Sequence, residues 1–177
     1  MAVAQAKPDA TEDRLAALVL PEGGWSASAR ADALARVRAM GLPKRRDEYW
    51  KYTRPDTLVQ PTAPVAAIFV NDEAPMFDEV DRLKVVFVDG VFDAAASDDL
   101  SMEGVTIERL AEVGGADIHW ARDIYGALET RGQDPVLRPL AALNTAFATD
   151  GLLIHVHGTP SRPICLVYHH GDENSDA

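Results

Sequence analysis

The stretch LKVVFVDGVF, Leu83 to Phe92, decides the fold. Within it, Val85 to Val88 is an apolar run without alternation, which is typical of a strand covered on both faces. Asp89-Gly90 follows, and this pair favours a two-residue type I′ turn because glycine tolerates the positive φ that the turn requires. We therefore predict a β-hairpin over Leu83 to Phe92, with its first strand in the core of an α+β fold.

Two short helices are predicted on the N-terminal side of this hairpin. Asp9 and Glu12 have the spacing of a capping box at the start of the first helix, which ends at Pro21. The second helix opens near Ser28 and closes at Gly41, where glycine is expected in the left-handed conformation. Both helices carry apolar residues at helical spacing and therefore need a surface on which to pack.

On the C-terminal side, predicted helices and strands alternate. A helix capped by Asp117 is expected to run to Arg131, and another to begin at Pro139, a favoured first-turn residue, with Gly151 as its terminator. The buried face expected for the helix after Asp117 consists of Ile124, Tyr125 and Leu128. Further strands are predicted at Val65 to Val70, Val105 to Ile107, Leu152 to Val156 and Pro163 to Tyr168.

Composition narrows the class of protein. The 28 acidic residues outnumber the 17 basic ones and give a net charge of −11, so the field of the protein repels nucleic acid and anionic lipid surfaces. No apolar stretch approaches the roughly 18 residues of a membrane-spanning helix, and we expect a soluble protein that stays in the cytoplasm. Cys165 is the single cysteine, which excludes an internal disulfide framework.

The most unusual block is LPKRRDEYWKYTRPDTL, Leu42 to Leu58. Its basic run, Lys44 to Arg46, either pairs with the neighbouring acids or contacts a phosphate or an acidic partner surface, and we favour the local pairing. Trp50 and Tyr52 either anchor the preceding helices to the sheet or stack on a flavin or nucleotide. We favour the anchor, because short amphipathic helices are not stable alone.

Within this block, GLPKRRDEYWKYT at Gly41 to Thr53 resembles the signature near the N-terminus of SufD proteins, which belong to the SufB/SufD family. Two further stretches resemble the same proteins in the same order, VVFVDGVF within Leu83 to Ala96 and ALNTAFATDGLLIHV at Ala142 to Val156. The resemblance therefore covers most of the chain. The signature residues, which we expect to be structural, are Arg45, Arg46, Glu48, Trp50, Lys51, Tyr52 and Thr53.

The resemblance implies a non-catalytic scaffold subunit of the SUF machinery for iron–sulfur cluster assembly, working in the cytoplasm with a SufB-like protein and a SufC-like ATPase. It implies an α+β fold, with N-terminal helices and a small mixed sheet in residues 1–137, followed by the first strands of a right-handed parallel β-helix, truncated, in residues 138–177. A cluster needs about four ligands, and Cys165 is the single cysteine. We therefore expect this chain alone to bind no cofactor, and the cluster, with any flavin, to belong to the complex.

The residues leave one alternative open, a small metal-dependent hydrolytic enzyme. His155 and His157 lie two apart in a predicted strand and point to one face, with His169 and His170 after the next strand. Without a third ligand at fixed spacing we favour half-exposed strand residues, and for Cys165 a buried, inert thiol. The sequence has no G-x-S-x-G motif and no P-loop, and we predict no catalytic, cofactor-binding or metal-binding residue.

Overall fold

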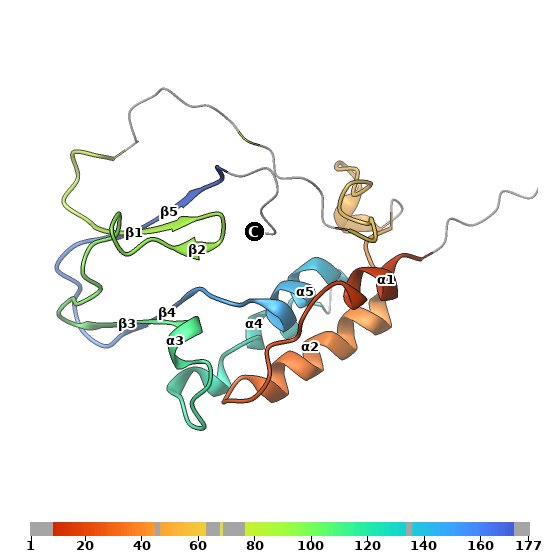
Figure 1. Cartoon of the computed structure of the whole chain (residues 1–177), viewed down its shortest axis with the longest axis horizontal. Helices are drawn as coiled ribbons and strands as arrows, with labels where there is room; N and C mark the ends of the chain where they lie inside the picture. Colours follow the sequence, from red (N-terminus) through yellow and green to blue (C-terminus); the bar gives the residue numbers. More distant parts are fainter. Residues whose placement is uncertain (1–8, 45–46, 63–67, 69–76, 134–135, 172–177) are drawn as a thin grey trace, which may run out of the picture. The chain divides into compact units, whose positions relative to one another are not determined.

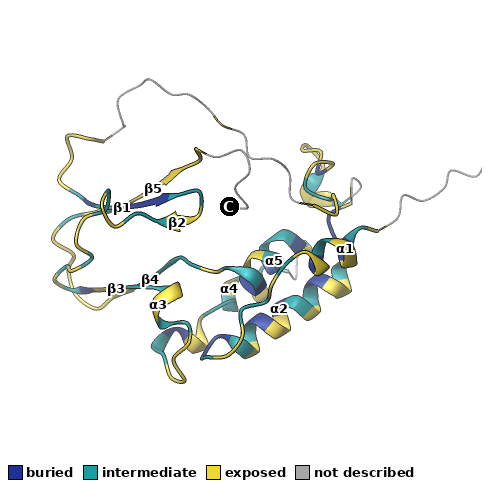
Figure 2. Ribbon diagram, in the orientation of Figure 1, coloured by how far each residue is buried: buried dark blue, intermediate teal, exposed yellow. Residues whose placement is uncertain are grey.

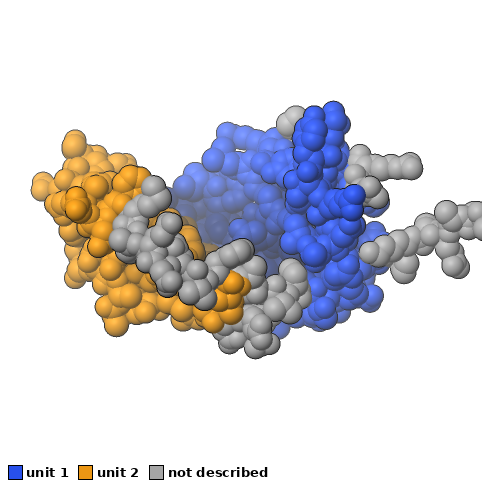
Figure 3. All heavy atoms as spheres, turned by 90° about the horizontal axis from the view of Figure 1, so that it is seen from above, with its two compact units in different colours: residues 1–64, 114–148 blue, residues 65–113, 149–177 orange. Residues whose placement is uncertain are grey.

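The structure is a computed structural model that describes residues 9–44, 47–62, 68, 77–133 and 136–171. The chain forms two compact units, each made of two separate stretches of sequence (Figure 3). Unit 1 comprises residues 1–64 and 114–148, and unit 2 comprises residues 65–113 and 149–177. The domain boundary expected between residues 137 and 138 stays a prediction.

Unit 1 is built on helices (Figure 1). Its core joins three of them, because Leu15 of α1 (Thr11–Ala16), Val37 of α2 (Ala27–Met40) and Ala142 of α5 (Pro139–Phe147) form one buried cluster. Partly buried side chains that pack around this cluster are Leu34, Met40, Leu143 and Phe147. The shorter elements of unit 1 are the 3₁₀ helices η1 (Glu48–Trp50) and η2 (Trp120–Asp123), and α4 (Ala127–Arg131).

The first helix starts differently from the prediction. The residue before α1 is Ala10, which makes no side-chain cap, so the predicted capping box of Asp9 and Glu12 is wrong. Asp9 instead accepts hydrogen bonds from the backbone N–H and the hydroxyl of Thr11. The end of α2 before Gly41 is confirmed, with φ 70° for this glycine, but its ψ of 172° is extended rather than left-handed helical.

The single long helix predicted after Asp117 is also wrong. Gly126 has φ 73° and ψ −5°, a left-handed conformation that separates η2 from α4. The predicted buried face is lost with this break, since Ile124 is 59% exposed and Leu128 is 78% exposed. Of the three residues expected on that face, Tyr125 is the one that packs against a ring, meeting Trp25 edge-on with centroids 5.5 Å apart.

The predicted hairpin is confirmed in unit 2. β1 (Leu83–Val88) pairs antiparallel with β2 (Val91–Phe92), and the turn residues Asp89 and Gly90 have φ values of 49° and 78°, both positive as a type I′ turn requires. β5 (Ile164–His169) lies on the other edge of β1 and runs parallel to it. β1 is therefore the central strand, and it is the buried one in Figure 2.

A second sheet completes the core of unit 2. β3 (Val105–Arg109) pairs antiparallel with β4 (Leu152–Val156) and leads directly into α3 (Leu110–Val113). Ile107 of β3 and Leu152 of β4 pack against the buried cluster of β1, so the two sheets share one core. The strand predicted at Val65 to Val70 falls outside the described residues, apart from Ile68.

The fold class is mixed α/β, with helices and small sheets that contain both parallel and antiparallel pairs. This agrees with the coarse form of the sequence prediction. None of the helices in the described part of the chain has the length and apolar character needed to cross a membrane.

Candidate functional site

The signature segment, defined here as Asp47–Pro55, is shaped by short-range hydrogen bonds. Asp47 accepts a bond of 2.7 Å from the backbone N–H of Lys44 through its carboxylate. The backbone N–H of Trp50 donates to the carbonyl of Asp47 at 2.9 Å, and that of Thr53 donates to the carbonyl of Trp50 at 3.2 Å. These bonds wind the segment into η1 and a following turn.

The signature segment is fixed at its flanks and exposed in its middle. Pro43, just before it, and Pro55, at its end, are both buried. Between them Tyr49 is 55% exposed and Tyr52 is 92% exposed. Trp50 is half-buried, and its indole N–H is enclosed with no acceptor among the described residues. The segment thus presents two tyrosines to the outside, and the contact predicted between Trp50 and the sheet stays a prediction.

The charges of the signature segment are exposed. Lys51 lies 3.6 Å from the carboxylate of Glu48 and 5.5 Å from the ring centre of Tyr52. Exposed ion pairs of this kind contribute about 0–1 kcal/mol, so they do not determine the fold of the segment. Arg45 and Arg46 of the predicted signature lie outside the described residues.

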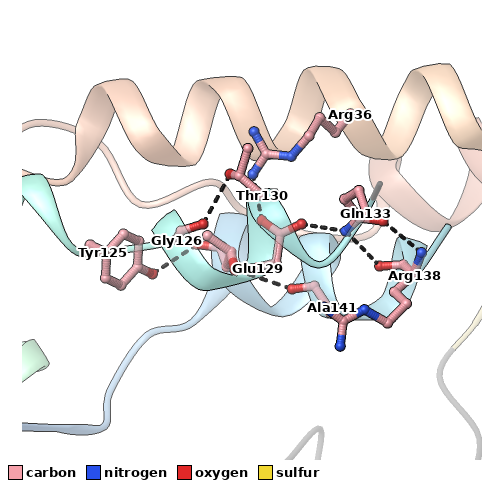
Figure 4. Close-up of polar contacts among 9 residues, drawn as sticks. Arg36, Tyr125, Gly126, Glu129, Thr130, Gln133, Arg138 and Ala141 are labelled. Carbon is pink, nitrogen blue, oxygen red and sulfur yellow. Dashed lines mark hydrogen bonds and ion pairs between the residues drawn. The ribbon is translucent and has the colours of Figure 1, made fainter. Parts of the chain in front are cut away.

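A polar network that the sequence analysis missed joins three helices of unit 1 (Figure 4). Arg36 of α2 forms an ion pair with Glu129 of α4, and the side-chain amide of Gln133 also donates to Glu129. Gln133 accepts a 2.6 Å bond from the backbone N–H of Arg138, next to α5. Because the side chain of Glu129 is 9% exposed, the network is a largely buried connection between α2, α4 and α5.

A groove of about 360 Å³ opens beside this network. Small-molecule sites are mostly apolar with a few polar groups, whereas this groove mixes acidic and basic side chains around one aromatic ring. We assign it no ligand. The charged and aromatic residues that line the groove are Asp32, Arg36, Asp123, Tyr125 and Arg131.

Arg30 and Tyr125 form a buried connection inside unit 1. Arg30 is 3% exposed, and its guanidinium donates to the hydroxyl of Ser26 and to the carbonyl of Ala146, both at 2.9 Å. The same guanidinium lies 5.4 Å from the ring centre of Tyr125, whose hydroxyl donates to the carbonyl of Thr145 at 2.8 Å. Burial raises the pKa of the Tyr125 phenol, and the positive charge of Arg30 partly opposes this shift.

In unit 2, Asp150 joins the end of β3 to the start of β4. One carboxylate oxygen pairs with the guanidinium of Arg109, and the other accepts bonds of 3.1 Å and 2.8 Å from the backbone N–H groups of Ala111 and Gly151. The guanidinium of Arg109 also covers the ring of Phe92 at 4.4 Å. Asp150 belongs to the stretch that resembles SufD proteins, and its contacts here are structural.

Two histidines of the alternative hypothesis differ in place from the prediction, since His157 follows the end of β4 and His169 is the last residue of β5. His155 lies in β4 opposite Thr106, and the rings of His155 and His157 are 5.9 Å apart between centroids. In the part of the chain that the structure describes, no three His, Cys, Asp or Glu side chains gather where they could hold a metal ion. Cys165, in β5, is partly exposed rather than fully buried.

Among the described strands of unit 2, β5 lies at one edge of the three-stranded sheet, and part of its apolar face is exposed. Ile164, Leu166 and Tyr168 point to the same side of the sheet as the buried residues of β1, because β5 and β1 are paired in register. On β1 this side is closed, with Val85 completely buried, but on β5 Leu166 is 43% exposed and Tyr168 is 58% exposed. The contrast is visible in Figure 2 as a buried β1 beside an exposed β5.

These observations define the class of protein: a mixed α/β chain of two compact units, with exposed aromatic side chains in the signature segment and an uncovered edge strand. A family profile described as SufBD protein N-terminal region matches residues 25–161. The chain therefore belongs to the SufB/SufD family, which links it to iron–sulfur cluster assembly by the SUF system. The profile covers both branches of the family and does not separate SufD from SufB. A comparison with curated proteins found no match.

Proposed function

We propose that this chain is a SufD-like scaffold subunit that works in the cytoplasm by binding a SufB-like protein and a SufC-like ATPase. In this proposal the chain performs no catalysis of its own. The iron–sulfur cluster, and any flavin, are held at the level of the complex.

The observation that carries this proposal is the edge strand β5. Its sequence, ICLVYH, contains no Asp, Glu, Lys or Arg, and no proline. Exposed edge strands normally carry such residues, since they prevent pairing with other chains. With apolar side chains exposed at Leu166 and Tyr168 as well, β5 has the character of a surface that another strand covers.

The parallel pairing of β1 and β5 also supports the finer part of the fold proposal. A parallel β-helix is built from parallel strands that pair side by side through their backbone hydrogen bonds. β5 already runs parallel to β1 along its whole length. We therefore propose that the β1–β5 pair is the first part of a right-handed parallel β-helix in this chain.

Co-purification tests the proposal. The chain is expressed with the SufB-like and SufC-like proteins of the same source, and the complex is isolated through a tag on the SufB-like protein. We expect wild-type chain in the complex, and a strong loss for Leu166→Lys, which puts a charge on the uncovered face of β5. Ile118→Lys is the matched control, because Ile118 is 86% exposed and lies in unit 1; this variant should co-purify normally.

Two results would contradict the proposal. If the wild-type chain associates with neither protein, the proposed scaffold role is wrong. If Leu166→Lys is retained in the complex as well as wild type, the proposed role of β5 is wrong. The absence of a cluster on the isolated chain is tested separately by anaerobic reconstitution with iron and sulfide, in which a stable cluster at one per chain would be incompatible with a single cysteine as the thiolate supply.

A further inference from the structure

Two histidines share one face of the sheet formed by β3 and β4. His155 lies in β4 directly opposite Thr106 of β3, and His157 follows one residue after the strand ends. Both side chains are exposed, and their rings face each other edge-on, 5.9 Å apart between centroids at an interplanar angle of 78°. Residues two apart in extended chain project to the same side, so this closeness follows from the backbone.

The separation of the rings is close to that of a chelating pair. Imidazole nitrogens bind Zn²⁺ at about 2 Å, which puts the ion about 3 Å from each ring centre and the two centres about 5 Å apart at a tetrahedral angle. The observed separation of the ring centres is 5.9 Å, and a small rotation of the side chains would shorten it to this value. The backbone therefore already brings the two rings close to the separation that one ion requires.

Thr106 orients one of these rings. Its hydroxyl oxygen lies 3.3 Å from Nε2 of His157. A neutral imidazole that donates from Nε2 to this oxygen has its lone pair on Nδ1, which is then the nitrogen available for a metal. Hydrogen bonds of this type to the second nitrogen are the usual support of a histidine ligand.

One copy of the chain supplies too few ligands for a closed site. Zinc in closed sites takes four ligands, and the described residues hold no cluster of three or more His, Cys, Asp or Glu that suits a metal. Among the strands that the structure describes, however, β4 has β3 as its one neighbour. Antiparallel pairing of β4 with a second copy, centred on Val156, would set His155 of each copy opposite His157 of the other.

We propose that His155 and His157 form half of a site for Zn²⁺ or a similar divalent cation of borderline softness, completed by the same two histidines of a second copy. The ion would hold two chains together along β4 with four imidazole ligands. This inference concerns unit 2 alone and does not depend on the SUF assignment.

The test measures mass and metal content on the untagged full chain. After removal of metal with EDTA, light scattering coupled to size exclusion should give the mass of one chain. With Zn²⁺ added we expect twice that mass and one ion per two chains, whereas Mg²⁺, which prefers oxygen ligands, should leave the mass unchanged. Thr106→Val should lower the affinity for Zn²⁺ about 10- to 100-fold, which is the usual effect of losing a hydrogen bond that supports a metal ligand.

Matched variants separate this site from zinc binding elsewhere. The double substitution His155→Ala and His157→Ala should abolish the zinc-dependent dimer. The double substitution His169→Ala and His170→Ala should retain the dimer. Adjacent residues in an extended chain point to opposite faces, so His169 and His170 do not form a chelating pair. A mass that does not change with Zn²⁺, a dimer that survives the loss of His155 and His157, or one ion bound per single chain would each overturn the proposal.

Discussion

Arg30 offers the sharpest test of the packing in unit 1. The last carbonyls of a helix have no partner within the helix, and the carbonyl of Ala146 is one of these at the end of α5. Arg30 of α2 donates to it at 2.9 Å and brings a positive charge to the negative end of the helix dipole. Replacing Arg30 by Met keeps much of the volume but leaves this carbonyl without a donor.

The expected loss follows from opposing terms. A hydrogen bond from a charged donor contributes roughly 1.5–3 kcal/mol, and an unsatisfied buried carbonyl costs about 1–3 kcal/mol. The contact with the ring of Tyr125 adds about 0.5–2 kcal/mol. Against these losses, Arg30→Met no longer buries a charge, which favours the variant. We expect a net loss of about 2–3 kcal/mol, and about half of that for Arg30→Lys, which keeps the charge but not the paired geometry.

Urea unfolding followed by tryptophan fluorescence measures the loss of stability in unit 1, where Arg30 lies. All three tryptophans, Trp25, Trp50 and Trp120, lie in unit 1, so their emission reports its unfolding. Arg38→Met is the control on the same helix, because Arg38 is 55% exposed with a loose pair to Glu12, and it should change stability by less than about 0.5 kcal/mol. If Arg30→Met were as stable as Arg38→Met, or more stable than wild type, the reasoning about the buried carbonyl would be refuted.

Three other substitutions test other contacts. Tyr125→Phe should lose about 1 kcal/mol at pH 7 with the bond to Thr145, and the difference should shrink in unfolding series above pH 10. The ordinary pKa is 10.0 and the folded pKa is raised, so the phenol stabilises the fold fully below the unfolded value and loses this effect as pH rises through the folded one. Asp150→Ala should lower the stability of unit 2 by about 2–3 kcal/mol, because it removes the largely buried partner of Arg109 and leaves only the exposed carboxylate of Glu112 to pair with it, and faster amide exchange along β3 would show it. Trp50→Ala should lose about 3–5 kcal/mol if Trp50 is the predicted anchor, whereas an unchanged denaturation midpoint together with flavin binding that disappears in the variant would contradict the anchor.

The parts of the fold that the sequence predicted are those set by neighbouring residues. The hairpin at Leu83 to Phe92 needs an apolar run and a two-residue turn, and both are local features. The strands β3, β4 and β5 lie close to their predicted ranges for the same reason. Their pairing was not predicted, because the parallel register of β1 with β5 joins residues about eighty positions apart, and no short-range pattern encodes it.

The long helix expected after Asp117 failed at one residue. Gly126 sits inside an apolar pattern at helical spacing, and the pattern outweighed it in the prediction. A glycine within such a pattern is itself a signal, because it accepts the left-handed conformation that the structure shows there. The partners of Arg36 had no comparable signal, since Glu129 lies 93 residues away in the sequence.

In the signature segment, a residue that matches the family signature does not always stabilise the fold of this chain. Its flanking prolines, Pro43 and Pro55, are buried, and Trp50 is half-buried, so a structural role is consistent with these three. Tyr52 is 92% exposed, and exposed substitutions usually change stability by no more than about 0.5 kcal/mol. A tyrosine that matches a family signature yet adds so little to its own fold is more readily explained by a contact outside the chain, since exposed tyrosines are enriched in interfaces. Tyr52 is therefore a test of the proposed scaffold role that is independent of β5. Co-purification of Tyr52→Ala with the partner proteins should be weakened, while its unfolding midpoint stays at the wild-type value. A Tyr52→Ala variant that binds the partners as wild type does would show that Tyr52 is an ordinary surface residue.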